Sequence, residues 1–305
     1  MQIKELINKG IQILKNNHIE DSNIKARVLL QYVLKKDKNY LVTNFNEEIS
    51  KQQEIEYRKY IEELIQGRPL QYITKSQEFM GLEFYVDENV LIPQPDTEIL
   101  VEEAMKEIEK MVKCKKDSDI SQNNTIRILD MCTGSGAIAI SIAKYFKNNL
   151  SSTQNNDIQL KIYGVDISTE ALEIAKKNAK LNQVQVEFFI SDMFKKMKEN
   201  TDEPFDIIIS NPPYIETDTI KTLSKEVKQE PHIALDGGKD GLNFYRTIAE
   251  EGKKYLARSG CILVEIGYNQ KEAVTRLFKK ENTQITCIKD LAGNNRVIKI
   301  QYMLS

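Results

Sequence analysis

The stretch "ILDMCTGSGAIAI", residues 128–140, contains an apolar run, a turn with two glycines and a second apolar run. We expect a buried strand that ends at Asp130, then a tight turn, then a helix that begins near Gly136. Gly134, Gly136 and Ala139 match the spacing G-x-G-x-x-A, which by itself would suggest a dinucleotide site. A strand-to-helix turn that binds no ligand is the alternative.

The position of Asp130 argues against a dinucleotide. A carboxylate at the end of the strand would face the pyrophosphate, which carries charge of the same sign. The same carboxylate suits a cationic ligand. S-adenosylmethionine carries an ammonium and a sulfonium group, and the close approach of its methionine part needs glycines without side chains. The turn is therefore a candidate site for this ligand.

From Glu98 onward, helical and strand patterns alternate along the chain. Such alternation predicts an α/β fold with a doubly wound, mostly parallel sheet that binds its ligand at the carboxyl ends of the strands. The predicted strands are IRILDM (126–131), KIYGVD (161–166), VQVEFFIS (184–191), FDIIIS (205–210), GCILVEIG (260–267), ITCIKD (285–290) and RVIKIQYM (296–303). The predicted helices lie at about 136–147, 168–181, 241–257 and 269–280. Two polar segments, 115–125 and 147–157, are expected to be surface loops.

Two further acidic residues lie at the ends of predicted strands. Asp166 closes "IYGVD", and an acidic side chain there can accept hydrogen bonds from both ribose hydroxyls of an adenosine. It could equally cap the next helix, but Ser168 is the better cap and leaves Asp166 for the ligand. Asp192 in "ISDMF" could accept from the adenine amino group while Met193 covers the ring. A plain turn residue is the alternative for Asp192.

The stretch "FDIIISNPPYIE", residues 205–216, is typical of a buried strand that ends in an amide, two prolines and a tyrosine. An amide or aryl-amine nitrogen is a poor nucleophile because its lone pair is delocalised into the neighbouring π system. An enzyme that methylates such a nitrogen must hold both N–H groups so that the lone pair points at the methyl donor. The Asn211 side-chain oxygen and the Pro212 carbonyl oxygen are natural acceptors for this purpose.

The remainder of this motif fits the same chemistry. The prolines stiffen the loop and bring no competing N–H group. Tyr214 can pack on the planar substrate group and stabilise positive charge that develops on the nitrogen. A proline-rich turn that only closes the strand is the alternative, and the two candidate cofactor motifs upstream favour the catalytic interpretation.

The chain has 305 residues, and its pattern changes near residue 76. Apolar positions recur at helical spacing before that point, which predicts a small helical bundle over residues 1–75. Residues 76–97 carry Gly81 and two prolines and are expected to form a hairpin or an extended linker. The sheet domain follows over residues 98–305. The apolar positions assigned to the bundle are Ile3, Leu6, Ile7, Ile11, Leu14, Ile24, Val28, Leu29, Tyr32, Val33, Ile55, Ile61, Leu64 and Ile65.

Composition narrows the classes of function. Hydrophobic residues make up 41% and charged residues 29% of the chain, as in soluble globular proteins. No apolar run is long enough to span a membrane, and the amphipathic start is unlike a secretory signal. The four cysteines show no metal-ligand spacing, so we expect no metal site and a reducing, cytoplasmic location. The net charge of −2 disfavours a strong polyanion binder.

Together these motifs resemble one known family. Besides the glycine turn, "VDIS" and NPPY, the chain carries "VLIPQPDTE", "QEPHIALDGGKDGL", "LVEIGYNQ" and "DLAGNNRV". This set is similar to that of the bacterial peptide chain release factor N5-glutamine methyltransferases over the full length of the chain. NPPY alone is shared with adenine-N6 methyltransferases, whereas the linker pattern and the GGKDGL segment make the narrower match.

The resemblance implies a class I S-adenosylmethionine-dependent methyltransferase with a Rossmann-like sheet and an N-terminal domain for substrate recognition. It implies methyl transfer to the side-chain nitrogen of the glutamine in the Gly-Gly-Gln loop of class 1 release factors, which act in translation termination. S-adenosylhomocysteine would be the product, and no metal, membrane or direct nucleic-acid partner is implied. Carried over by position, cofactor contacts fall on Asp130, Cys132, Thr133, Gly134, Ser135, Gly136, Asp166, Asp192, Met193 and Asn211. Substrate contacts fall on Asn211, Pro212, Pro213 and Tyr214, and Asn211, Pro212 and Tyr214 are the catalytic candidates.

Two places depart from the pattern of this family. The family usually has glycine where Cys132 stands, and arginine followed later by glutamate where Gln94 and Asp96 stand. Cys132 is small enough to keep the turn if its backbone φ lies below zero. Gln94 removes a fixed positive charge that could bind an acidic partner.

Two other functions remain open at this stage. A DNA or RNA adenine methyltransferase would share the chemistry, but it must flip a base into the site and generally carries a basic recognition domain. A cofactor-binding protein without catalytic activity is the second, and the intact motif from Asn211 to Tyr214 speaks against it. An assay for consumption of S-adenosylmethionine would separate an enzyme from this non-catalytic alternative.

Overall fold

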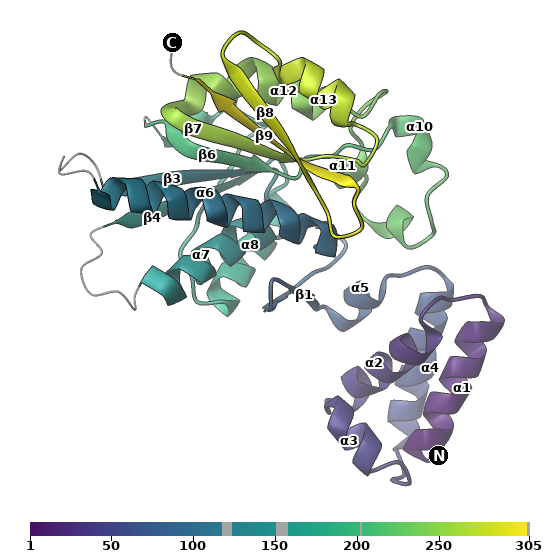
Figure 1. Cartoon of the computed structure of the whole chain (residues 1–305). Helices are drawn as coiled ribbons and strands as arrows, with labels where there is room; N and C mark the ends of the chain where they lie inside the picture. The colour runs from purple at the N-terminus through teal and green to yellow at the C-terminus, as the bar shows by residue number, and fades with distance from the viewer. Residues whose placement is uncertain (118–123, 151–157, 202, 304–305) are drawn as a thin grey trace. The chain divides into compact units, whose positions relative to one another are not determined.

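Seven strands form one sheet within the residues that the computed structural model describes, which are 1–117, 124–150, 158–201 and 203–303 (Figure 1). The strands are β3 (Thr125–Met131), β4 (Gln159–Asp166), β5 (Glu187–Ile190), β6 (Phe205–Ser210), β7 (Leu256–Glu265), β8 (Thr283–Lys289) and β9 (Asn295–Tyr302). Their order is β5-β4-β3-β6-β7-β9-β8, with β9 antiparallel to both neighbours and the other pairs parallel. The predicted strands and the doubly wound sheet are confirmed.

Helices cover both faces of this sheet (Figure 1). The helices α6 (Glu98–Asp117), α7 (Ala137–Leu150) and α8 (Thr169–Leu181) share one core, and α12 (Asn243–Glu251) and α13 (Lys271–Phe278) share the other. In β6, Ile207 and Ile209 pack into the first core and Ile208 into the second. Side chains alternate between the faces of a strand, so a strand covered on both sides reads as a continuous apolar run. This explains "FDIIIS".

Several predicted boundaries are displaced by a few residues. The strand β3 ends at Met131, as the prediction of 126–131 has it, but begins one residue earlier, and α7 begins at Ala137. The helix predicted over 241–257 is shorter, because a 3₁₀ turn η3 (Gly252–Tyr255) follows α12 and β7 already begins at Leu256. The two predicted loops lie partly outside the described residues. Their first residues, 115–117 and 147–150, are helical, which corrects the loop bounds.

The described chain separates into two units. One contains residues 1–76 together with 223–229, and the other contains residues 77–222 and 230–305. The hairpin expected near Gly81 is present in the second unit, where β1 (Gln77–Phe79) pairs antiparallel with β2 (Leu82–Phe84). The inclusion of residues 223–229 in the first unit has no counterpart in the sequence pattern.

The first unit is helical. Its helices are α1 (Ile3–Asn16), α2 (Ser22–Leu34), α3 (Lys38–Thr43), α4 (Lys51–Ile65) and α5 (Leu70–Thr74), with the short 3₁₀ turn η2 (Val227–Gln229) from the later segment. No helix in the described part of the chain is both long and apolar enough to cross a membrane.

Three residues assigned to the core of the bundle are exposed instead. The exposed fractions are 61% for Ile24, 38% for Tyr32 and 54% for Ile55. In α2 the buried apolar positions are Ala26, Leu29, Leu30 and Val33, and in α4 they are Tyr57, Ile61 and Leu64. These sets follow the i, i+3, i+4, i+7 spacing of one helix face. A residue two positions before such a set lies about 200° around the helix, which places Ile24 and Ile55 on the outer side.

Candidate active site

A cavity lies at the carboxyl ends of β3, β4 and β6, where the order of strands reverses direction. This topological switch point is where open α/β sheets bind their ligands. The cavity encloses about 830 Å³ with its open mouth included. Its lining residues are Asn89, Val90, Leu91, Met131, Cys132, Gly134, Val165, Asp166, Ile167, Ser168, Ala171, Ser191, Asp192, Met193, Asn211, Pro213, Pro231, Ile233, Ala234 and Phe244.

Asp130 lies behind the glycine turn and is not among the lining residues. Its side chain is fully buried, and Oδ2 accepts hydrogen bonds from the Thr133 hydroxyl at 2.6 Å and the Ala139 N–H at 3.3 Å. Burial raises the pKa of Asp130 to about 7, although both hydrogen bonds act in the opposite direction. The carboxyl group thus joins the turn to the start of α7, and its direct contact with the ligand stays a prediction.

The turn itself departs from the condition set for Cys132. The backbone φ of Cys132 is +61°, in the left-handed region, so the expectation of a negative φ is wrong. A side chain in this region costs about 1 kcal/mol or more, which is the physical reason for glycine at such a position. Burial, followed by the nearby Asp166 and Asp130 carboxyls, raises the pKa of the Cys132 thiol. The thiol is therefore expected to stay protonated.

Gly136 is required for close packing. A Cβ atom built on Gly136 would lie 2.8 Å from Ile140 Cδ1 and 3.2 Å from the Cβ of Ala175 in α8, and its φ is +80°. Both the space and the backbone conformation exclude a side chain there. The glycine signature thus brings α7 and α8 together beside the cavity.

Asp166 ends β4 and lines the cavity, as predicted. It is not free of partners, because Oδ2 accepts from the Gly134 N–H at 2.9 Å and Oδ1 from the Ser168 N–H at 3.0 Å. Each carboxylate oxygen can accept a second hydrogen bond, so contact with a ribose remains open to it. Burial raises the pKa of Asp166, and the backbone N–H groups oppose that rise. Ser168 caps α8 as expected, with Oγ accepting from the Ala171 N–H at 3.1 Å.

The corner after β5 brings Asp192 and Met193 to the cavity. Met193 is buried and its sulfur lies 3.8 Å from the Cys132 thiol. The Ser191 hydroxyl donates to the Met193 carbonyl at 2.7 Å and accepts from the Lys196 N–H at 3.1 Å, which fixes the corner. The Asp192 carboxylate is more open and forms an ion pair with Lys195. Both positions suit the predicted contacts with an adenine ring, which stay predictions.

Asn211 follows β6 directly and reaches the cavity from the opposite side of the switch point. Its side-chain Nδ2 donates to the Thr97 hydroxyl oxygen at 3.1 Å. Thr97 is buried at the end of the 3₁₀ turn η1 (Pro95–Thr97). Because the donor end of the amide is engaged by Thr97, Oδ1 is the end that remains for a substrate N–H. This is the orientation that the proposed chemistry needs.

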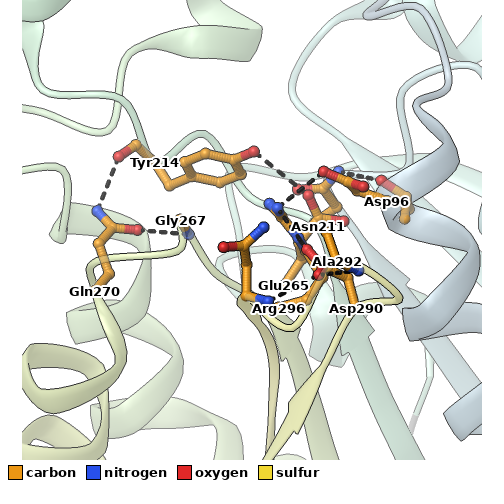
Figure 2. Close-up of polar contacts among 11 residues, drawn as sticks. Asp96, Asn211, Tyr214, Glu265, Gly267, Gln270, Asp290, Ala292 and Arg296 are labelled. Atoms are coloured by element: carbon orange, nitrogen blue, oxygen red, sulfur yellow. Dashed lines mark hydrogen bonds and ion pairs between the residues drawn. The ribbon is translucent and has the colours of Figure 1, made fainter.

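Side chains at the end of β7 and just before α13 hold Tyr214, the last residue of the proline loop (Figure 2). The Tyr214 hydroxyl donates to Glu265 Oε1 at 3.4 Å, and the Tyr214 carbonyl accepts from Gln270 Nε2 at 3.0 Å. Pro213 lines the cavity, whereas Pro212 and Tyr214 are not among its lining residues. Burial and then the Glu265 carboxyl raise the pKa of Tyr214, so its hydroxyl stays protonated.

The chain is similar to known proteins over nearly its whole length. Residues 5–74 match the PrmC N-terminal domain and residues 122–300 match a methyltransferase domain. The chain is 40% identical over 302 residues to the release factor glutamine methyltransferase of Clostridium acetobutylicum, with 98% of each chain covered. The chain belongs to the release factor glutamine methyltransferase family. The relative from Thermodesulfovibrio yellowstonii is 39% identical over 304 residues, which cover 98% of this chain and 96% of that one.

A solved structure from the same family is also similar. The protein-(glutamine-N5) methyltransferase (release factor-specific) from Alicyclobacillus acidocaldarius is 28% identical, with a TM-score of 0.41. The similarity covers 72% of this chain and 100% of that one. The family resemblance drawn from the sequence motifs is confirmed by the full-length relatives.

Several residues at this methyltransferase site were not assigned from the sequence. Asn89 to Leu91 come from the linker, and Pro231, Ile233, Ala234 and Phe244 come from the segment around GGKDGL. That segment was noted only as a family motif, without a place in the fold. A Cβ atom on Gly237 would lie 2.8 Å from Tyr214 Cα, so this glycine lets the segment pass against the proline loop. The motif was the available signal, but its contact was not visible in the sequence.

Gln94 and Asp96, the two linker residues that differ from the family pattern, both form contacts within this protein. Gln94 donates through Nε2 to the Ile92 carbonyl at 3.0 Å, so its side chain folds back on the linker. Asp96 forms an ion pair with Arg296 at 2.8 Å, and Arg296 also contacts Asp290 at 3.1 Å (Figure 2). The aspartate at this position thus joins the linker to the start of β9.

Proposed function

We propose that the protein transfers the methyl group of S-adenosylmethionine to the side-chain nitrogen N5 of the glutamine in the Gly-Gly-Gln loop of class 1 release factors. The relatives, which share full-length similarity, carry the name of this activity. The observation that carries the proposal in the structure is the Asn211 amide, held at the cavity with Nδ2 on Thr97. A fixed amide oxygen at that place is what recognition of an N–H group requires.

The residues that line the cavity support the assignment of S-adenosylmethionine as its ligand. The backbone at Gly134 leaves room at one end, and Asp166 supplies carboxylate oxygens at the wall. Met193 and Ile167 supply apolar surface, and Asp192 a carboxylate, where an adenine would lie. The turn from Cys132 to Gly136 and the groups at 166, 192 and 193 would therefore hold the cofactor. When bound, it supplies an electrophilic methyl group on a cationic sulfur.

The chain's own residues then act on the glutamine amide. Asn211 Oδ1 and the Pro212 carbonyl oxygen accept its two N–H groups and fix the plane of the amide. Fixing the nucleophile in line with the methyl group converts a bimolecular encounter into a positioned reaction, which is the main source of rate acceleration here. Overall the methyl–sulfur bond would break, a bond between the methyl carbon and the glutamine nitrogen would form, and the nitrogen would release one proton to water. Tyr214 remains the candidate to stabilise positive charge that develops before that proton leaves.

Recognition of a folded release factor needs a second surface. One side chain in a small pocket provides little contact, whereas specific protein interfaces usually bury about 1,200–2,000 Å² in total. We assign this second surface to the helical unit of residues 1–76. A chain that begins at residue 76 should bind S-adenosylmethionine with unchanged affinity but methylate release factor far more slowly. Equal methylation by the shortened chain would assign the helical unit to stability alone, and circular dichroism checks that the shortened chain is folded.

Mass spectrometry of release factor tests the proposed function directly. Incubation with the protein and S-adenosylmethionine should add one methyl group, and tandem spectra should place it on the glutamine of the Gly-Gly-Gln loop. A release factor with this glutamine replaced by alanine is the matched control and should gain no methyl group. Labelled adenine in DNA or RNA together with unlabelled release factor would contradict the proposal.

A further inference from the structure

We propose that Thr97 and Glu265 are positioning residues that fix the Asn211 amide with its oxygen toward the substrate. Neither residue lines the cavity. Thr97 acts through Asn211, which does line it, and Glu265 acts through Thr97. This inference rests on the proposed function, because it explains how that site is held ready. It adds two residues that the sequence pattern did not assign to catalysis.

The first contact is the hydrogen bond from Asn211 Nδ2 to the Thr97 hydroxyl oxygen at 3.1 Å. An asparagine amide can rotate by 180° and exchange its oxygen and nitrogen with little change in shape. With the nitrogen outward, the amide would present two donors to a substrate nitrogen that also carries donors. A partner that only accepts from Asn211 is therefore needed to make one orientation the stable one.

A hydroxyl group is not such a partner unless its own proton is engaged elsewhere. The Thr97 hydroxyl lies close enough to the buried Glu265 carboxyl group to lower its pKa, and an ionised carboxylate can only accept a hydrogen bond. The Thr97 proton is then directed to Glu265, and the Thr97 oxygen faces Asn211 as an acceptor. We expect the carboxylate to draw the Thr97 proton toward itself and so to set the direction of the Asn211–Thr97 hydrogen bond.

Glu265 also holds Tyr214, the last residue of the NPPY motif. It lies at the end of β7 with 2% of its surface exposed, and its Oε1 accepts from the Tyr214 hydroxyl at 3.4 Å (Figure 2). Its Oε2 has no hydrogen-bond partner that meets normal geometry within the described part of the chain. One carboxyl group therefore supports both Asn211 and Tyr214.

The charged surroundings determine when this carboxyl group is ionised. Burial raises the pKa of Glu265 to about 7, and Asp96 acts in the same direction, while the Thr97 hydroxyl, Arg296 and the Tyr214 hydroxyl oppose the rise. The buried Tyr245 also lies against this strand end, where its hydroxyl donates to the Glu265 carbonyl at 2.7 Å. Assays at pH 8 keep the carboxyl group mainly ionised.

The main test is Thr97→Val, which keeps the shape of the side chain but removes the acceptor. We expect kcat for release factor methylation to fall by about 10–100-fold, while KM for release factor and the Kd of S-adenosylmethionine change less than about threefold. Thr97→Ser restores the hydroxyl and should recover most of the lost kcat. A Thr97→Val variant with wild-type kcat overturns the proposal, as does a loss that Thr97→Ser fails to recover.

Glu265→Gln tests the second contact. It should lower kcat with little change in cofactor affinity, and the loss in the double variant with Thr97→Val should be smaller than the product of the two single losses. Losses that multiply fully would mean that Glu265 acts independently of Thr97. That result would overturn the proposal that Glu265 acts on Asn211 through Thr97.

A spectroscopic measurement separates this proposal from the proposed function. The side-chain NH₂ of Asn211, assigned by NMR through the Asn211→Asp variant, should exchange with solvent at least several-fold faster in Thr97→Val than in the wild type. Failure of the wild-type protein to methylate release factor would remove the proposed function but leave this readout intact. Equal exchange rates in the two proteins would show that Thr97 does not hold the amide.

Discussion

The glycine turn after β3 and the proline loop after β6 lie at the ends of paired strands, yet different kinds of contact hold them. Asp130 binds groups three and nine positions away, at Thr133 and Ala139. The proline loop instead depends on Thr97, 114 positions from Asn211, and on Glu265, 51 positions from Tyr214. The first is mostly shaped by its own sequence, and the second by side chains brought in from elsewhere in the fold.

This difference implies a division of effects on activity. Changes in the turn should alter cofactor binding or stability, because the turn forms the wall of the cavity. Changes in the proline loop and its supports should alter kcat, because they orient the nucleophile after the cofactor is bound.

The largest effect is expected for Asn211→Ala in the proline loop. The variant loses the acceptor that orients the substrate nitrogen, so kcat should fall by about a hundredfold or more. Methylation of release factor measures this loss, and calorimetry should show that S-adenosylmethionine still binds. Turnover like that of the wild type would remove the positioning role of the loop.

Asp166→Ala instead changes a residue that lines the cavity beside the glycine turn. The carboxylate is expected to form charge-assisted hydrogen bonds to the ribose, so cofactor binding should weaken by about 2–4 kcal/mol. Isothermal titration gives the Kd. Asp192→Ala is the matched control, because that carboxylate is more open to solvent and should matter less. Unchanged affinity in Asp166→Ala would reduce Asp166 to a structural role in holding Gly134 and Ser168.

A pH-dependent effect on stability is expected at Asp130. Its pKa is about 7 in the folded protein and 3.8 for an ordinary aspartate, so the folded state binds the extra proton between these values. The stability that Asp130 contributes is fully present below about pH 4 and is lost as the pH rises through about 7. The free energy of unfolding of Asp130→Asn, taken relative to that of the wild type, should therefore rise by about 1–3 kcal/mol when the pH is raised from 5 to 8.

Urea denaturation at the two pH values measures this change. Glu230 and Glu265 also have pKa values raised to about 7 by burial, but they are present in both proteins and cancel in the comparison. A constant difference between Asp130→Asn and the wild type at the two pH values would mean that Asp130 is ionised throughout.

The smallest effect is expected at Cys132. Cys132→Gly should be more stable than Cys132→Ala by about 1 kcal/mol, because glycine adopts a φ of +61° without steric cost. Both variants lose the thiol, so the comparison isolates the backbone. Thermal unfolding of the two variants, with and without S-adenosylmethionine, measures the difference in their stability. Greater stability of the alanine variant would mean that the turn relaxes away from the left-handed conformation.

The sequence allowed much of the fold to be predicted, since strands such as β6 read as apolar runs and Ser168 marks the start of α8. It misplaced Ile24 and Ile55, because both are apolar but lie about 200° around their helices from the buried face. It also treated Cys132 as compatible with a negative φ, since the conformation of one turn residue depends on the elements on either side.

The chemistry of the site was determined by the sequence itself, in the glycine turn, the acidic strand ends and the NPPY motif. These signals are local, because a turn or a strand end needs residues that are close in the chain. Only the tertiary structure decided how Asn211 is held. Thr97, Glu265 and Arg296 come from three separate segments, and a hydrogen bond between residues 114 positions apart leaves no spacing in the sequence that could predict it.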